Sequence, residues 1–192
     1  RICKKAIYSV EVVVIMGGVF SFLDWAFGEG KKAYLLILGL DASGKTTLLN
    51  RLKTNEGCVT IPTIGFNTET ISYGRLTFTL FDIGGQATFR KMWHHYFENC
   101  NGVVFVIDCN DGARMGIVKK EIWTLLEHPM LQDIPFLFFA NKQDLPNAIG
   151  KEALITRLDL LKIRGREWSV AESTATEGHG IENGFDWLSK NL

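Results

Sequence analysis

The sequence predicts a single α/β domain built on a mostly parallel, six-stranded sheet with helices on its faces. Three runs of mostly apolar residues, at 33–38, 102–107 and 135–140, have the composition of strands buried on both faces of a parallel sheet. Helix-like segments separate these runs, which is the order expected of a doubly wound fold. Ligands in that architecture bind at the carboxyl ends of the strands, so the loops after the apolar runs are the candidate sites.

The remaining elements follow from the same kind of pattern. Residues 76–81 and 68–72 alternate apolar and polar side chains, as half-exposed strands do, and residues 73–75 between them predict a hairpin turn. A further apolar stretch lies at residues 168–171. Helices are expected over residues 45–52, 115–126, 149–154 and 181–192.

Composition limits the class of protein. The chain has 192 residues, 46% of them hydrophobic and 22% charged, which is enough for one domain with a short extension. Lys and Arg number 21, as do Asp and Glu, so the formal net charge is zero and we expect no nucleic-acid partner, which would require a basic surface. The four cysteines have neither metal-ligand nor disulfide-framework spacing and predict reduced thiols: Cys3, Cys58, Cys100 and Cys109.

Residues 39–46 read GLDASGKT, which fits the phosphate-loop pattern GxxxxGK[ST] and lies between a predicted strand and a predicted helix. The glycines let successive backbone N–H groups turn toward a phosphate, and Lys45 adds a full positive charge at the helix N-terminus. Thr46 offers a hydroxyl ligand to Mg²⁺. The motif predicts a P-loop NTPase, and alone it does not separate kinase, ATPase and GTPase. We expect phosphate contacts from Asp41, Ala42, Ser43, Gly44, Lys45, Thr46 and Thr47.

A candidate base-reading motif, NKQD at residues 141–144, follows the third apolar run. One carboxylate can accept the N1–H and the exocyclic amino group of guanine side by side, whereas adenine has an acceptor at N1 and no 2-amino group. The aspartate therefore predicts selection of guanine, because an unmatched buried polar group is costly. The asparagine can bridge the base and neighbouring loops, and the stem of the lysine can lie over the ring. We assign guanine contacts to Asn141, Lys142, Asp144 and the backbone of Thr174 and Ala175.

Two further segments carry residues suited to sensing a γ-phosphate. Thr63 offers a second hydroxyl to Mg²⁺, and Asp82 can hold the metal through water. The Gly85 N–H can face the γ-phosphate. Gln86 can orient the attacking water, because a neutral amide both donates and accepts hydrogen bonds. We therefore assign the catalytic roles to Gln86 and Lys45.

Together these segments resemble the Arf family, the ADP-ribosylation factors and Arf-like proteins of the Ras superfamily. The resemblance spans roughly residues 17–192 and implies a small GTPase domain over residues 31–192. The stretches that carry it are GLDASGKTT (39–47), IPTIGFNTET (61–70), DIGGQ (82–86), ANKQDLP (140–146), TAT (174–176) and GFDWLS (184–189).

The resemblance implies a GTP-binding switch and GTP hydrolase, with Mg²⁺, that regulates vesicle or membrane traffic. GTP would shift the register of the hairpin at residues 66–81, expose an effector surface of Phe66, Phe81 and Tyr96, and release an N-terminal helix onto a membrane. The implied partners are an exchange factor, a GTPase-activating protein, effector or coat proteins, and the cytoplasmic surface of the Golgi or another endomembrane. Phe81 departs from the tryptophan usual at its position, and Asp41 near the phosphates predicts slow unaided hydrolysis.

The N-terminal segment carries a candidate membrane anchor. Residues 16–21 (MGGVFS) match the MGxxxS pattern for N-myristoylation, with Gly17 as the acceptor. On a helix over residues 17–30, the apolar side chains cover an arc of about 160°, which predicts an interfacial amphipathic helix. Because myristoylation needs a free Gly17, residues 1–16 are expected to be an upstream or non-native extension.

Three alternatives remain open. The apolar stretch at residues 6–23, preceded by two lysines, is compatible with a signal anchor, although Glu11 near its centre disfavours one. A GTP-locked scaffold or Arf-like adaptor would bind GTP with negligible turnover, and Gln86 favours real turnover. A P-loop metabolic kinase would use ATP, against which Asp144 argues.

Overall fold

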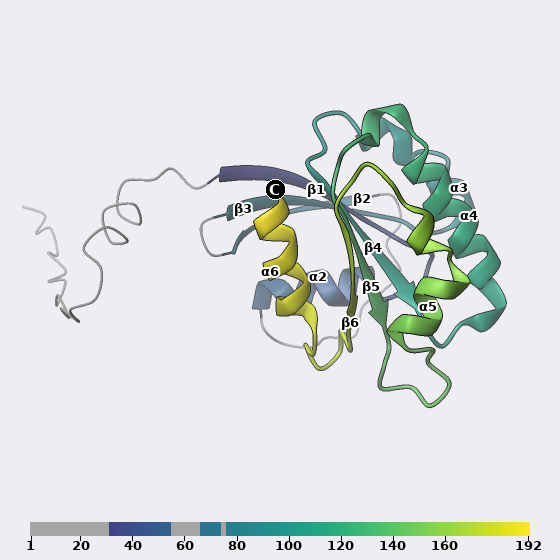
Figure 1. Ribbon diagram of the computed structural model, residues 1–192. Helices are drawn as coiled ribbons and strands as arrows, with labels where there is room; N and C mark the ends of the chain where they lie inside the picture. The colour runs from purple at the N-terminus through teal and green to yellow at the C-terminus, as the bar shows by residue number, and fades with distance from the viewer. Residues whose placement is uncertain (1–30, 55–65, 74–75) are drawn as a thin grey trace, which may run out of the picture. The chain divides into compact units, whose positions relative to one another are not determined.

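Residues 31–54, 66–73 and 76–192, which are the residues that the computed structural model describes, contain a six-stranded sheet in the order β2-β3-β1-β4-β5-β6 (Figure 1). β2 and β3 pair antiparallel, and the other neighbours in the sheet pair parallel. This confirms the predicted mostly parallel six-stranded sheet. The strands are β1 (Lys31–Leu38), β2 (Phe66–Tyr73), β3 (Leu76–Ile83), β4 (Gly102–Asp108), β5 (Phe136–Asn141) and β6 (Trp168–Glu172).

Helices cover both faces of the sheet (Figure 1). On one face lie α2 (Lys45–Thr54) and α6 (Ile181–Asn191), and on the other α3 (Ala87–Arg90), α4 (Met115–Leu126) and α5 (Lys151–Arg157). Short 3₁₀ helices join them: η1 (Trp93–Tyr96), η2 (Gly112–Arg114), η3 (Pro129–Leu131) and η4 (Leu160–Lys162). The helix predicted at residues 149–154 instead begins at Lys151, because Gly150 is extended and serves as its N-cap residue.

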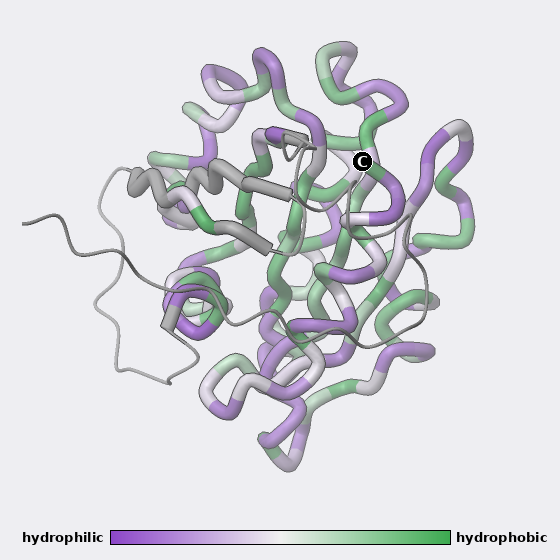
Figure 2. The backbone as a smooth tube through the Cα atoms, turned by 90° about the vertical axis from the view of Figure 1, so that its left-hand side faces the viewer, coloured by the Kyte–Doolittle hydropathy of each residue, from purple (hydrophilic) through white to green (hydrophobic). Residues whose placement is uncertain are grey.

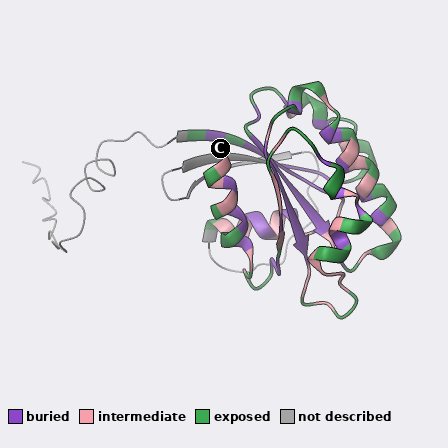
Figure 3. Ribbon diagram, viewed as in Figure 1, coloured by how far each residue is buried: buried purple, intermediate pink, exposed green. Residues whose placement is uncertain are grey.

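The central strands explain why apolar runs predicted the sheet. Every residue of β5 is buried, and successive side chains enter opposite layers of the core. Phe138 packs in the cluster that holds Ile122 of α4, whereas Phe139 packs in the cluster that holds Phe185 of α6, with ring centroids 5.8 Å apart. Figures 2 and 3 show the hydrophobic, buried residues concentrated along these strands.

Several sequence predictions fall on residues outside the described part of the chain. They are the amphipathic helix at 17–30 with its acceptor Gly17, the extension at 1–16, the alternative anchor at 6–23, and the metal ligand Thr63. Within residues 31–54, 66–73 and 76–192, none of the helices has the length and hydropathy needed to cross a bilayer.

Candidate nucleotide-binding site

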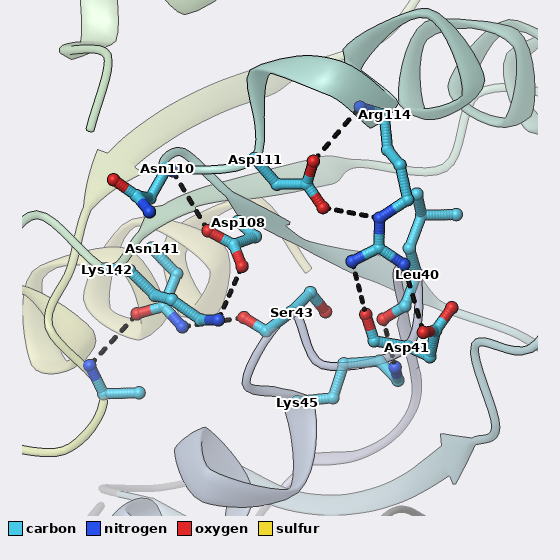
Figure 4. A network of polar contacts seen from close by, with 11 residues as sticks. Leu40, Asp41, Ser43, Lys45, Asp108, Asn110, Asp111, Arg114, Asn141 and Lys142 are labelled. Carbon is cyan, nitrogen blue, oxygen red and sulfur yellow. Dashed lines mark hydrogen bonds and ion pairs between the residues drawn. The ribbon is translucent and has the colours of Figure 1, made fainter. Parts of the chain in front are cut away.

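Five loops gather at one edge of the sheet because five strands run parallel. They comprise residues 39–44, 84–86, 109–114, 142–146 and 173–180, which follow β1, β3, β4, β5 and β6. The chain thus brings the phosphate-loop, DIGGQ, base-reading and TAT motifs to the carboxyl ends of the strands, where α/β proteins bind their ligands. Figure 4 shows polar contacts that join four of these loops.

Two glycines of the phosphate loop have positive φ angles and lie against neighbouring segments. Gly39 has φ +144°, and a Cβ there would lie 2.3 Å from the carbonyl oxygen of Val106 on β4. Gly44 has φ +98°, and a Cβ there would lie 2.3 Å from Nδ2 of Asn141. Both positions therefore require glycine, for its backbone conformation and for lack of space. Lys45, the next residue, begins α2, so the loop meets a helix N-terminus.

Lys45 lies in the hollow of the phosphate loop. Its Nζ donates hydrogen bonds to the carbonyl oxygens of Gly39 (3.1 Å) and Leu40 (2.9 Å). Burial lowers the pKa of Lys45 to about 8, and the negative charges of Asp82 and Asp41 oppose that shift. The Lys45 ammonium group, which was predicted to bind the phosphates, is therefore buried against the backbone of the phosphate loop. A bound anion there would stabilise the protonated form of Lys45.

Thr46 and Asp82 form the candidate metal site. Thr46 Oγ1 donates to Asp82 Oδ2 at 2.5 Å, and Asp82 is fully buried at the end of β3. A hydroxyl and a carboxylate are oxygen ligands of the kind that Mg²⁺ prefers. The residues present therefore fit the metal, with Thr46 as its ligand and Asp82 behind it. Thr47, one residue further along α2, is half-buried.

The loop after β3 packs directly against the phosphate loop. A Cβ on Gly85 would lie 2.2 Å from the carbonyl carbon of Leu40 and 2.3 Å from the backbone nitrogen of Asp41, so only glycine fits. Arg90 Nη1 donates to the Gly85 carbonyl oxygen at 2.9 Å, and its Nε donates to Glu121 at 3.0 Å. Arg90, the arginine nearest to this loop in the sequence, is therefore engaged with the loop and α4.

Gln86 follows Gly85 and is exposed. It precedes α3 with an extended backbone, and its carbonyl oxygen accepts from Phe89 and Arg90. The backbone at this position is therefore fixed while the side chain faces solvent. Its role in orienting water remains a prediction.

Asn141 joins the predicted guanine end of the site to the phosphate loop. Its Nδ2 donates to the Ser43 carbonyl oxygen at 2.8 Å, and its Oδ1 accepts from the Ala175 amide (3.0 Å) and the Ser173 hydroxyl (3.2 Å). The side chain is 1% exposed. Asn141 thus links the phosphate loop to the loop after β6, while its predicted contact with the base remains a prediction.

The other predicted guanine contacts surround Asn141. Lys142 has a left-handed backbone, φ +67°, and its Nζ donates to Asp108 Oδ2 at 2.5 Å. Thr174 is buried, and its carbonyl oxygen accepts from the amides of Glu177 and Gly178. Asp144 lies three residues after Asn141 and is exposed, and its contact with a base remains a prediction.

The loop after β4 carries charged residues that motif analysis did not assign to the site. Asp108 pairs with Lys142, while Arg114 pairs with Asp41 of the phosphate loop at 3.0 Å and with Asp111 at 2.5 Å (Figure 4). The Arg114 hydrogen bond lowers the pKa of Asp111. The strand-end rule that located the other motifs also points to this loop, since Asp108 ends a buried strand.

The predicted effector residues lie on three elements. Phe66 begins β2 and Phe81 lies in β3, and their side chains are outside the described part of the structure. Tyr96 ends η1, where it is partly buried against the core cluster that includes α4. Their grouping into one surface remains a prediction.

The fold and these loops define a small GTPase, a P-loop protein with a guanine-reading motif. The model of the ADP-ribosylation factor (Arf) family matches residues 19–192, and the chain belongs to this family. A solved structure of the Arl6 BBS3 small GTPase from Trypanosoma brucei, with bound nucleotide analogue GppNp, is similar: 37% identity, TM-score 0.78, covering 83% of this chain and 96% of that one. The protein is thus a GTP-binding switch of a family of GTP hydrolases that use Mg²⁺ with the nucleotide.

Proposed function

We propose that this chain hydrolyses GTP slowly and regulates vesicle or membrane traffic through GTP-dependent membrane attachment and effector recruitment. The observation that carries the nucleotide part of the proposal is the Asn141 side chain. It ties the Ser43 carbonyl of the phosphate loop to the Ala175 amide of the loop after β6. Hydrogen bonds therefore connect the base-reading segment to the phosphate loop, which supports the binding of one nucleotide across both.

The residues divide the hydrolytic work. Lys45 and the backbone of the phosphate loop bind and orient the phosphates, and the Gly85 N–H stabilises charge on the γ-phosphate. Gln86 orients the attacking water. Thr46 and Thr63 would hold Mg²⁺ directly and Asp82 would hold it through water, and the ion would supply positive charge to neutralise the phosphates. We expect unaided turnover to be slow because Gln86 is exposed to solvent.

Guanine selection is tested with fluorescent GDP, GTP and ATP analogues in the presence of Mg²⁺. The parent chain should bind both guanine nucleotides and discriminate against ATP by about 10⁴-fold or more, since an unmatched polar group is left at Asp144. Asp144→Asn should lose most of that discrimination, while Asp133→Asn, an exposed aspartate in another loop, should keep it. Equal affinity of the parent for ATP and GTP would favour the kinase alternative.

Phosphate release separates a slow hydrolase from a GTP-locked scaffold. The parent should release phosphate from bound GTP, faster with a GTPase-activating protein, and Gln86→Leu should reduce both rates. Gln132→Leu, a change at an exposed glutamine outside the site, serves as the matched control. A Gln86→Leu variant as active as the parent would remove the assigned role of this residue.

The membrane part of the proposal places the protein in the cytoplasm, peripherally attached to the Golgi or another endomembrane. A chain that starts at Gly17, with and without myristate, should float with liposomes when loaded with a GTP analogue and stay unbound with GDP. The same loaded state should recruit an effector or coat protein, after an exchange factor has supplied GTP. Nucleotide-independent flotation would contradict the switch, and flotation in neither state would favour a soluble scaffold.

A further inference from the structure

Arg114 makes a four-point connection between the loop after β4 and the phosphate loop (Figure 4). Its Nη1 donates to the Asp41 carboxylate at 3.0 Å, and its Nη2 donates to the Asp41 main-chain carbonyl at 3.2 Å. On its other side, Nε donates to Asp111 Oδ2 at 2.5 Å and the Arg114 amide to Asp111 Oδ1 at 3.1 Å. Asp111 therefore holds the guanidinium group in the orientation in which it contacts Asp41.

The charge at Asp41 matters because the ligand of this loop is a polyanion. A carboxylate in a phosphate-binding loop repels the phosphates unless a cation neutralises it or holds it aside. Among the residues that follow β4 in this loop, from Cys109 to Arg114, the arginine is the one basic side chain, since Gly112 and Ala113 are uncharged and exposed. Neutralisation of Asp41 from this loop therefore depends on Arg114.

The contact differs from an ordinary surface ion pair in its geometry. The Arg114 and Asp41 side chains are 32% and 44% exposed, so the pair by itself adds little to the stability of the fold. The second contact, however, is to the Asp41 carbonyl oxygen, which belongs to the curled backbone of the phosphate loop. A planar guanidinium group can donate to the carboxylate oxygen and to the main-chain carbonyl oxygen of Asp41 at the same time, in a geometry that an ammonium group cannot reproduce.

We propose that Arg114 is a positioning residue for nucleotide binding, which neutralises Asp41, holds its peptide in place and keeps its carboxylate away from the phosphates. The inference rests on the proposed GTP binding at the phosphate loop. Without the guanidinium, the carboxylate would repel bound GDP and GTP alike. Arg114 acts through Asp41 and does not itself contact GDP or GTP.

The test is the rate at which a fluorescent GDP analogue leaves the full chain in Mg²⁺, chased with excess GDP. Arg114→Gln should raise this rate about five-fold, the factor that corresponds to about 1 kcal/mol, the upper end for an exposed ion pair. Arg114→Lys keeps the charge, loses the two-oxygen contact and should fall between. Arg157→Gln is the matched control, because Arg157 donates to the carbonyl of Gly112 in the same loop without pairing with Asp41.

A double mutant with Asp41 distinguishes a positioning role of Arg114 from a general loss of fold stability. In an Asp41→Asn background, where the negative charge is absent, Arg114→Gln should change the dissociation rate by less than about two-fold. The Arg114→Gln effect should also shrink at high ionic strength, since salt screens the exposed carboxylate. Thermal unfolding of Arg114→Gln should match that of Arg157→Gln.

Three results would overturn the inference. They are an Arg114→Gln dissociation rate equal to that of the parent, the same increase in the Asp41→Asn background, or a loss of thermal stability that accounts for the faster dissociation. A parent chain that fails to bind the fluorescent GDP would overturn the proposed function, and this inference with it. Binding by the parent with no effect of Arg114→Gln would overturn the inference alone.

Discussion

Replacement of Asn141 by alanine should destabilise the domain even without nucleotide. The side chain makes three hydrogen bonds, to the Ser43 carbonyl (2.8 Å), the Ala175 amide (3.0 Å) and the Ser173 hydroxyl (3.2 Å), and it is 1% exposed. Alanine removes all three and leaves partners that come from two other loops.

The magnitude follows from those partners. Each buried polar group that loses its partner costs about 1–3 kcal/mol, so three at the low end give about 3 kcal/mol. Because the melting temperature of a domain of this size falls by about 2–4 °C per kcal/mol, the expected drop is about 6–12 °C. The phosphate loop and the loop after β6 would also lose their common support, so affinity for GDP and GTP should fall together.

The assay is urea and thermal unfolding of the nucleotide-free chain, because bound nucleotide adds its own stabilisation and would mix affinity with fold stability. Asn147→Ala, at an exposed asparagine a few residues further on, is the matched control and should change the free energy of unfolding by less than about 0.5 kcal/mol. A loss below about 1 kcal/mol for Asn141→Ala would refute the reasoning, since it would mean that water replaces the amide at low cost.

Three further substitutions or treatments test other parts of the structure. Arg90→Met removes the donor to the Gly85 carbonyl and should slow phosphate release by about five-fold at unchanged GDP affinity; an unchanged rate would contradict this support. Burial raises the pKa of Cys100 to about 11 and of Cys109 to about 12, so iodoacetamide at pH 8 should label neither in the folded chain, and labelling should rise about tenfold per pH unit toward the pKa, as peptide mass spectrometry can measure. Gly180→Ala places a Cβ 1.8 Å from the carbonyl oxygen that ends β6, at φ +76°, and should lower the free energy of unfolding by about 1–3 kcal/mol or more in urea; a neutral change would show that the loop relaxes.

The sheet could be predicted from the sequence because its strands are buried on both faces. β4 and β5 are apolar except for the polar residue that ends each strand, and the predicted helix at 115–126 coincides with α4, whose buried residues recur at helical spacing. α3 was not predicted. It is four residues long and has no buried residue, so it contains neither a full apolar repeat nor a core-facing stripe.

The site was predictable where chemistry and position coincided. Asn141 ends a buried strand, and its amide was predicted to bridge the base and neighbouring loops; the structure shows the contacts with the loops, and the contact with the base stays a prediction. Arg114 was not predicted as part of the site, because its partner Asp41 is 73 residues away in the sequence. A long charged side chain on a surface loop has many possible partners, and neither periodicity nor a local motif selects one of them.

The loop after β4, with Asp108 at the end of that strand, contacts both the base-reading segment and the phosphate loop, which the motifs alone do not reveal. One end of this loop holds Lys142 through Asp108, next to the base-reading group, and the other end holds Asp41 through Arg114, in the phosphate loop. We expect GDP and GTP to share the groups that these two contacts influence, because the residues assigned to sensing the γ-phosphate, Thr63, Gly85 and Gln86, belong to other segments. Changes in this loop should therefore alter the dissociation of both nucleotides equally, whereas changes at Gly85 or its support should alter hydrolysis. Retention of nucleotide and its turnover would then be set by different loops, and each could vary without the other.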